Sequence, residues 1–235
     1  MGRAFEFRKG RKLKRWASMA KNFTKVNREV TIAVKEAGPD PETNSKLRIA
    51  IQNAKALNVP KDNVDRAIQK AMGKDSADYK EIVYEGYGPH KVAFVVETAT
   101  DNPTRTVANV RSYFSKYGGS LASSGTFDFI FSPDSVFKIK AEGIDIEELE
   151  LDLIDHGLEE LFPEDDCIVI YAGFKNFGAM QKALEERGVE LVSAEFERNA
   201  NVSKELTDEQ KADVDKLIDK LDEDEDVVNF FHNMA

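Results

Sequence analysis

The segment that decides the fold begins with Val136-Phe-Lys-Ile-Lys140, which resembles a strand, and continues to Glu197. Alternating apolar residues indicate strands, whereas apolar residues at spacings of three and four indicate helices. The later elements are a helix using Ile146, Leu149 and Leu153, strands at 158–162 and 167–172, a helix using Phe177, Met180 and Leu184, and a strand at 189–197. This βαββαβ order is typical of the ferredoxin-like arrangement. It implies no iron–sulfur cluster, because Cys167 is the only cysteine.

Further strands and helices flank this segment on both sides. Before it, the pattern predicts strands at 81–85 and 91–98, a turn at 86–90, a helix from Asn102-Pro103 to Gly118-Gly119, and a strand at 126–131 with Phe127, Phe129 and Phe131 on one side. After it, Thr207 and Gln210 form a capping box before a helix, and 227–231 is a strand. A lone helix and strand cannot bury both faces. We therefore expect a middle domain of residues 78–133 and 203–235, into which residues 134–202 are inserted.

The N-terminal part is predicted to be helical. Apolar residues recur at helical spacing from Ser18 to Ala37, from Leu47 to Leu57 and after Pro60, and Gly38 and Gly73 follow the first and third of these series. Residues 1–77 are therefore expected to form a three-helix bundle. The fold class expected for the whole chain is α+β and multidomain.

The charge of the chain is unevenly distributed. Residues 1–77 contain 18 Lys and Arg against 8 Asp and Glu, a balance of +10, whereas residues 78–235 contain 15 against 35, a balance of -20. The first 35 residues alone carry 11 basic and 2 acidic side chains. Such asymmetry predicts a basic segment that binds polyanions, attached to an acidic body. A lysine-rich solvated helix face on an ordinary acidic body is the alternative.

Candidate nucleic-acid contacts follow from this basic segment. Lys and Arg neutralise phosphates and release counterions, and Arg and Trp also stack on exposed bases. The candidates are Arg3, Arg8, Lys9, Arg11, Lys12, Lys14, Arg15, Trp16, Lys21, Lys25 and Arg28, of which the last three are expected on the outer face of the first helix. A basic helix also suits an anionic membrane, but the bundle needs the apolar face of this helix, so no membrane partner is expected.

Signatures of enzymes and metal sites are not found in the sequence. It has no phosphate-binding glycine loop or nucleophile elbow, and the three histidines lie in separate predicted elements. The run Asp222–Asp226 lacks the glycine and glutamate of a calcium loop, and it is interpreted as a solvated helix end. We expect no catalytic residues, cofactor or metal. The lone cysteine, the absence of a secretory signal and a longest apolar run of six residues favour a cytoplasmic location.

Several motifs together resemble the YebC/PmpR family, whose mitochondrial members are translational activators of cytochrome c oxidase. They are Phe23-Thr-Lys25 with Arg28-Glu29, Asp40-Pro41, Asn44-x-x-Leu47-Arg48, Pro60-Lys-Asp-Asn63 with Arg66-Ala67-Ile68, Tyr84-Glu-Gly-Tyr-Gly-Pro89, Asp101-Asn102, Arg105-Thr-Val-Ala108 with Val110-Arg111, and Gly118-Gly119. The similarity covers essentially the whole chain. One departure is the start, where Arg3-Ala-Phe-Glu-Phe7 stands in place of the family's frequent His-Ser-Lys-Trp, so contacts of that tip do not carry over.

The resemblance implies a helical N-terminal domain, two α+β domains, and a non-enzymatic regulator of gene expression. Family members are commonly described as probable DNA-binding transcriptional regulators. Others act in translation at the ribosome, including the relief of stalling at proline-rich stretches. Ribosomal RNA is therefore an alternative target, and a protein-binding adaptor is a second alternative.

The family motifs also indicate a second candidate functional surface at Glu85, Tyr87, Arg105 and Arg111. A role in maintaining the fold is the competing interpretation. Gly86 and Gly88 permit unusual backbone angles, and Arg105 is a candidate ion-pair partner for Glu85.

Overall fold

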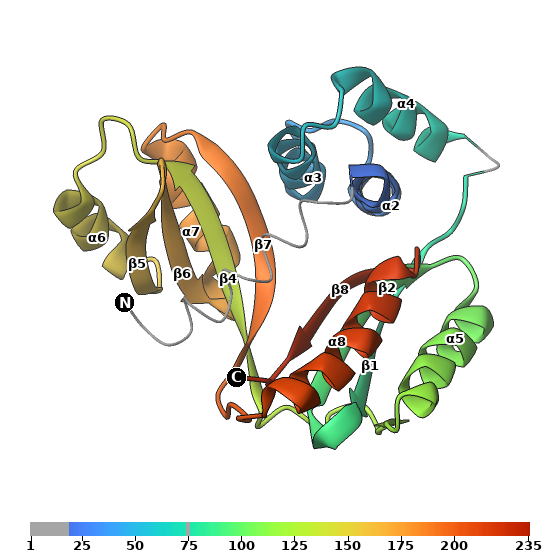
Figure 1. Ribbon diagram of the computed structural model, residues 1–235. Coiled ribbons are helices and arrows are strands. Elements are labelled where there is room, and N and C mark those ends of the chain that lie inside the picture. The colour runs from blue at the N-terminus through green and yellow to red at the C-terminus, as the bar shows by residue number, and fades with distance from the viewer. Residues whose placement is uncertain (1–18, 74–75) are drawn as a thin grey trace.

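The computed structural model describes residues 19–73 and 76–235, which form an α+β structure. This part of the chain contains seven α-helices and two four-stranded antiparallel sheets (Figure 1). Among the helices of these residues there is no candidate for a membrane span.

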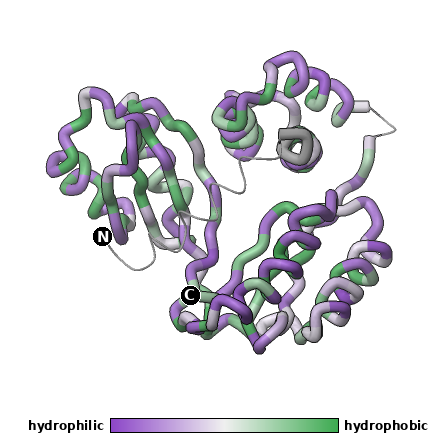
Figure 2. Tube along the Cα trace, viewed as in Figure 1, coloured by the Kyte–Doolittle hydropathy of each residue, from purple (hydrophilic) through white to green (hydrophobic). Residues whose placement is uncertain are grey.

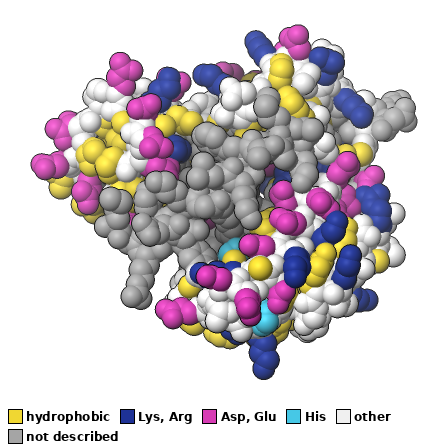
Figure 3. Space-filling model, viewed as in Figure 1, with side chains coloured by type: hydrophobic (Ala, Val, Ile, Leu, Met, Phe, Trp, Pro, Cys, Tyr) yellow, Lys and Arg dark blue, Asp and Glu magenta, His cyan; other side chains and the backbone are white. Residues whose placement is uncertain are grey.

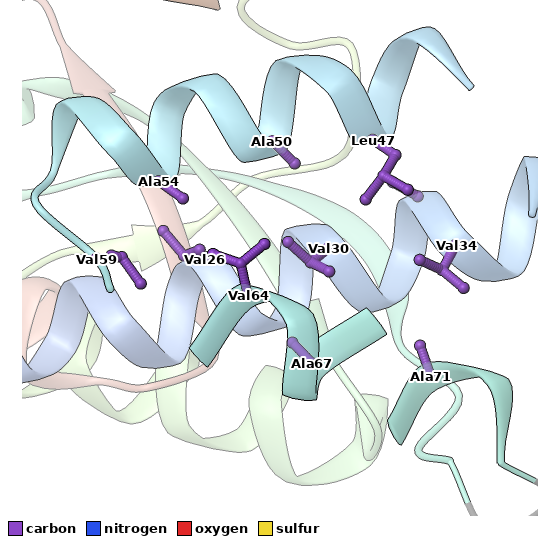
Figure 4. Close-up of a cluster of buried hydrophobic side chains, with 11 residues drawn as sticks. Val26, Val30, Val34, Leu47, Ala50, Ala54, Val59, Val64, Ala67 and Ala71 are labelled. Carbon is purple, nitrogen blue, oxygen red and sulfur yellow. The ribbon is translucent and has the colours of Figure 1, made fainter. Parts of the chain in front are cut away.

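Three helices precede the first sheet: α2 (Met19–Ala37), α3 (Ser45–Ala56) and α4 (Lys61–Met72). Helix α2 ends before Gly38, which has a φ of +92°, a left-handed conformation that glycine adopts readily. The Asn44 side chain caps α3 by accepting from the Leu47 N–H, and it also donates to the carbonyls of Ala33 and Gly38. Figure 4 shows the core between the helices, to which each contributes small and branched side chains, including Val30, Ala54 and Val64.

The first sheet has the strand order β3-β1-β2-β8, so it joins residues from the middle and the end of the chain. Its strands are β1 (Lys80–Tyr87), β2 (Ala93–Thr100), β3 (Ser120–Leu121) and β8 (Val227–His232). Helices α5 (Pro103–Lys116) and α8 (Asp208–Glu223) pack on one face, against Phe94 and Val96. The predicted cap at Asn102 and the predicted capping box of Thr207 and Gln210 are both confirmed.

Two expectations about this region are wrong. Residues 126–130 form a turn rather than a strand, because the N–H groups of Ile130 and Phe131 both donate to the Phe127 carbonyl. Phe127 is therefore buried while Phe129 is 70% exposed. Gly86 and Gly88 are required for close packing and not for unusual angles, since neither has a positive φ. A Cβ would meet the Phe114 ring at 2.7 Å from Gly86, and the Phe94 ring at 2.7 Å from Gly88.

The second sheet has the order β5-β6-β4-β7, and all of its pairings are antiparallel. Its strands are β4 (Phe131–Lys140), β5 (Leu158–Glu164), β6 (Cys167–Gly173) and β7 (Leu191–Ala200). Helices α6 (Ile146–Ile154) and α7 (Phe177–Glu186) pack on one face of this sheet around Phe137 and Ile139. In Figure 2, hydrophilic and hydrophobic residues alternate along the helices, as expected for helices with one buried face.

Candidate nucleic-acid interface

The predicted basic segment lies mainly outside the described residues. Eight of the candidate residues precede residue 19 and therefore lie outside the described residues: Arg3, Arg8, Lys9, Arg11, Lys12, Lys14, Arg15 and Trp16. Lys21 belongs to α2, and Lys25 is half-buried on the same helix.

The expectation that Arg28 lies on the outer face of α2 is wrong. Only 9% of the Arg28 side chain is exposed, and its Nη1 lies 3.1 Å from a carboxylate oxygen of Asp226. The same nitrogen donates to the carbonyl of Ala99 at 2.9 Å and to the carbonyl of Glu225. The guanidinium also lies 5.3 Å from the centre of the Tyr79 ring. Arg28 therefore ties α2 to the first sheet and is not available to phosphate.

Asp226 is the centre of a network of hydrogen bonds and ion pairs that includes Arg28. The interpretation of residues 222–226 as a solvated helix end is therefore wrong for Asp226, the last of these residues. Its side chain is 4% exposed. Besides Arg28, it accepts hydrogen bonds from Arg105 Nη2 at 2.8 Å, Thr106 Oγ1 at 2.8 Å and Thr100 Oγ1 at 3.2 Å. Burial alone raises the pKa of Asp226, but the hydrogen bonds from Arg105 and Thr106 and the charges of both arginines outweigh it and lower the pKa. The carboxylate thus stays ionised between two guanidiniums from different helices.

Arg105 does not pair with Glu85. It lies on α5 and bonds to Asp226 and, at 3.0 Å, to Asp101. The hydrogen bond and the charge of Asp226 raise the pKa of Arg105. Arg111 lies further along α5 and is exposed. Arg105 and Arg111 therefore differ in role, since the first belongs to the buried ion network.

A pocket of about 440 Å³ opens beside this network and is bordered by Arg28, Tyr79, Asp101, Arg105, Asn109, Tyr113 and residues 224–226. The Tyr113 hydroxyl donates to Asp224 at 2.9 Å. Burial and this hydrogen bond raise the pKa of Tyr113 to about 12. Four carboxylates against two guanidiniums give the lining an acidic excess, which opposes the binding of an anion.

Glu85 and Tyr87 hold the turn at residues 123–130 against β1. The Glu85 carboxylate is buried and accepts from the backbone N–H groups of Gly125 at 2.7 Å and Phe127 at 2.8 Å. The Tyr87 ring packs edge-on against Phe127, with centroids 4.8 Å apart, and Tyr87 is 37% exposed. Glu85 thus has a structural role, since it fixes the turn, whereas the Tyr87 side chain reaches the surface of the protein.

Four other cations of the helical region are paired with carboxylates of the same chain. Lys46 bonds to Glu36 at 2.6 Å, Lys35 lies 3.5 Å from Asp78, and Arg48 and Lys55 pair with residues that follow α7 or lie on it. Figure 3 shows Lys and Arg beside Asp and Glu over the described part of one face. The residues described hold no group of three or more His, Cys, Asp or Glu suited to a metal ion.

Comparisons with known proteins find matches that together cover nearly all of the chain. A family model described as the TACO1/YebC protein N-terminal domain matches residues 3–74, and one described as the TACO1/YebC second and third domain matches residues 79–234. A probable transcriptional regulatory protein of Flavobacterium johnsoniae is 58% identical over 234 residues, covering 100% of this chain and 99% of that protein. One of Porphyromonas gingivalis is 57% identical over 235 residues, covering 100% and 97%. The crystal structure of a conserved hypothetical protein from Aquifex aeolicus has a TM-score of 0.78 and 33% identity, covering 93% of this chain and 91% of that chain.

Proposed function

The chain belongs to the TACO1/YebC family, and we propose that it is a non-enzymatic, DNA-binding regulator of transcription that holds the phosphate backbone through its basic N-terminal domain. The names of its relatives, probable transcriptional regulatory proteins, support the regulatory part of this proposal. The proposed place of action is the cytoplasm.

The observation that carries the binding part is the charge of the first 35 residues, with 11 basic and 2 acidic side chains. Arg28 is not one of the proposed contacts, because its buried guanidinium is paired with the Asp226 carboxylate. The proposed contacts are then Arg3, Arg8, Lys9, Arg11, Lys12, Lys14, Arg15, Trp16, Lys21 and Lys25. Phosphate contacts of this kind fix position and orientation more than they read sequence.

The rest of the chain is proposed to set the orientation of the bound nucleic acid. Residues 78–235 carry a balance of -20 and repel a polyanion, so binding is directed to the N-terminal side. We propose domains at 1–77, at 78–133 with 203–235, and at 134–202, the last a ferredoxin-like insertion. The pairing of β8 with β2 and the strand order β5-β6-β4-β7 support this division.

Crosslinking in cells, followed by sequencing of the attached nucleic acid, tests the proposal. Recovery of promoter DNA is the expected result. Recovery of ribosomal RNA would replace it with the ribosome-associated translation factor, which relieves stalling at proline-rich stretches in related proteins. Recovery of no nucleic acid would overturn both and favour the protein-binding adaptor.

A further inference from the structure

The second sheet buries side chains on both of its faces. Helices α6 and α7 pack on one face (Figure 1). On the opposite face, Val136, Val169 and Tyr171 are only 3%, 1% and 4% exposed. Phe162 completes this cluster by stacking on Tyr171 with ring centroids 5.9 Å apart, and within the described residues the cluster contains strand side chains only. Because side chains on an open sheet face are in contact with water, burial this complete requires a cover.

Phe196 shows how exposed an aromatic side chain of the same sheet remains under a partial cover. It lies on the edge strand β7 and packs against Phe174 and Phe177, with ring centroids 4.9 and 4.5 Å apart, yet it is 43% exposed. Tyr171 on β6 is 4% exposed, although Phe162 stacks on only one side of its ring. The cover of the opposite face therefore reaches the two central strands, β4 and β6.

Carboxylates border this apolar cluster on both edge strands. Directly opposite residues of antiparallel strands share a face, and the strand register places Glu160, Glu195 and Glu197 on the face of the cluster. Lys138 lies on this face as well, but it is paired with Glu164 at 2.8 Å, so these two residues add no net charge. An apolar centre with an acidic border suits a polypeptide segment that is both basic and apolar, and it repels nucleic acid.

Residues 1–18 of the same chain have this composition. They contain seven basic side chains and one acidic side chain, together with Phe5, Phe7, Leu13 and Trp16. A stretch of this length spans up to about 60 Å when extended. The face is within its reach, because α2 begins at Met19 and α3 contacts β7. Attachment to the same chain raises the effective concentration of the segment to about the millimolar range, which favours it over a second copy of the chain.

We propose that the face formed by Val136, Phe162, Val169 and Tyr171 is the docking surface of residues 1–18 of the same chain. Apolar side chains of the segment cover the cluster, and its cations pair with the carboxylates on the edge strands. The sheet then competes with nucleic acid for the same cations, so only a polyanion that binds them more strongly releases the segment. The competition rests on the proposed function, whereas the docking does not.

Hydroxyl-radical footprinting of the full chain tests the docking, because oxidation of a side chain follows its exposure. The test variant replaces Arg11, Lys12, Lys14 and Arg15 by Glu. We expect the oxidation of Tyr171 to rise by up to about 15-fold in this variant, since each lost ion pair weakens docking about twofold. Phe137, which is buried on the helix-covered face, is the internal reference and should stay protected.

A variant with the same change in net charge is the matched control. Replacement of Lys80, Lys182, Lys211 and Lys216 by Glu should leave Tyr171 protected. Unchanged oxidation of Tyr171 in the N-terminal variant, or an equal rise in both variants, would overturn the docking.

Carbodiimide crosslinking, which joins lysines to carboxylates in contact, identifies the occupant of the face. In a mixture of isotope-labelled and unlabelled full chains, we expect crosslinks within one chain from Lys9, Lys12 or Lys14 to Glu160, Glu195 or Glu197. Crosslinks only between labelled and unlabelled chains would overturn the proposal in favour of a second copy. Equal crosslinking to Glu147 and Glu150, two exposed positions on α6, would also overturn it by showing that the contacts are unspecific.

Addition of a 20-base-pair DNA duplex to the same mixture tests the competition. We expect the crosslinks to the sheet to decrease as the duplex binds. Binding of the duplex with undiminished crosslinks would overturn the competition. Failure of the unaltered chain to bind the duplex would overturn the proposed DNA binding, while crosslinks within one chain would still support the docking.

Discussion

Arg28 on α2 and Asp226 just before β8 form a buried ion pair, with Nη1 and Oδ1 separated by 3.1 Å. Asp226 also binds Arg105, so one carboxylate links the N-terminal helices, α5 and the end of the first sheet. A buried charge is costly when it loses its partner. The ion network therefore fixes how the N-terminal helices sit on the first sheet.

Replacement of Asp226 by Asn is expected to destabilise the protein strongly. The substitution leaves two guanidiniums around a neutral group, and breaking a buried pair in this way costs about 3–5 kcal/mol. Urea unfolding followed by circular dichroism measures the loss. Asp219→Asn, an exposed position on α8, is the control and should change the unfolding free energy by less than about 0.5 kcal/mol. Equal effects of the two substitutions would contradict the role given to Asp226.

The contribution of Asp226 should depend on pH in a defined direction. Because its pKa in the folded state is lowered from 3.8, the stabilisation is complete above pH 3.8 and is lost as the pH falls through the folded-state pKa. The difference in unfolding free energy between the unaltered chain and Asp226→Asn should therefore be constant near neutrality and shrink in acid. A difference that grows as the pH falls below 3.8 would show that the sign is wrong.

Replacement of Glu85 by Ala is expected to release the turn at residues 123–130. Two backbone N–H groups lose a charged acceptor, at a cost of about 2–4 kcal/mol. The Gly125 and Phe127 amides should exchange faster with solvent, which nuclear magnetic resonance measures. Glu81→Ala changes an exposed position of the same strand and should leave both amides as they are.

Tyr113 should ionise later than an ordinary tyrosine. Burial and the hydrogen bond to Asp224 raise its pKa to about 12. In an alkaline titration followed by phenolate absorbance, the unaltered chain should show a component near this pH that Tyr113→Phe lacks. Circular dichroism checks that both proteins remain folded at this pH. Loss of a component near pH 10 instead would show that Tyr113 is not held as described.

Local signals in the sequence were sufficient to predict most helices and strands. Gly38, Asn102 and the pair Thr207 and Gln210 mark helix ends through contacts with nearby residues, so a short window contains the information. The alternation of Phe127, Phe129 and Phe131 predicted a strand wrongly, because a turn can produce the same pattern of burial. In this turn two N–H groups donate to the Phe127 carbonyl, and the first and third rings are buried while the second is exposed.

The ion network could not be predicted in the same way. Arg28 stands beside Glu29 in a helix that carries several lysines, and Asp226 ends the acidic run of residues 222–226, so the local pattern at both positions is typical of solvent-exposed surface. Only the folded chain brings them together, and no spacing in the sequence indicates such a pair. Glu85 was singled out through the family motif, but its acceptance of hydrogen bonds from Gly125 and Phe127 depends on the path of the loop.

The salt dependence of DNA binding tests the central claim most directly, by comparing the unaltered chain with a variant in which Arg11, Lys12, Lys14 and Arg15 are replaced by Glu. If about five phosphates are neutralised, affinity for a 20-base-pair duplex should fall about 500-fold between 50 and 200 mM salt. The variant should keep its helical content by circular dichroism and lose binding, whereas the same replacement at Lys80, Lys182, Lys211 and Lys216 should retain it. Equal affinity and an equal salt slope for the unaltered chain and the N-terminal variant would contradict the account.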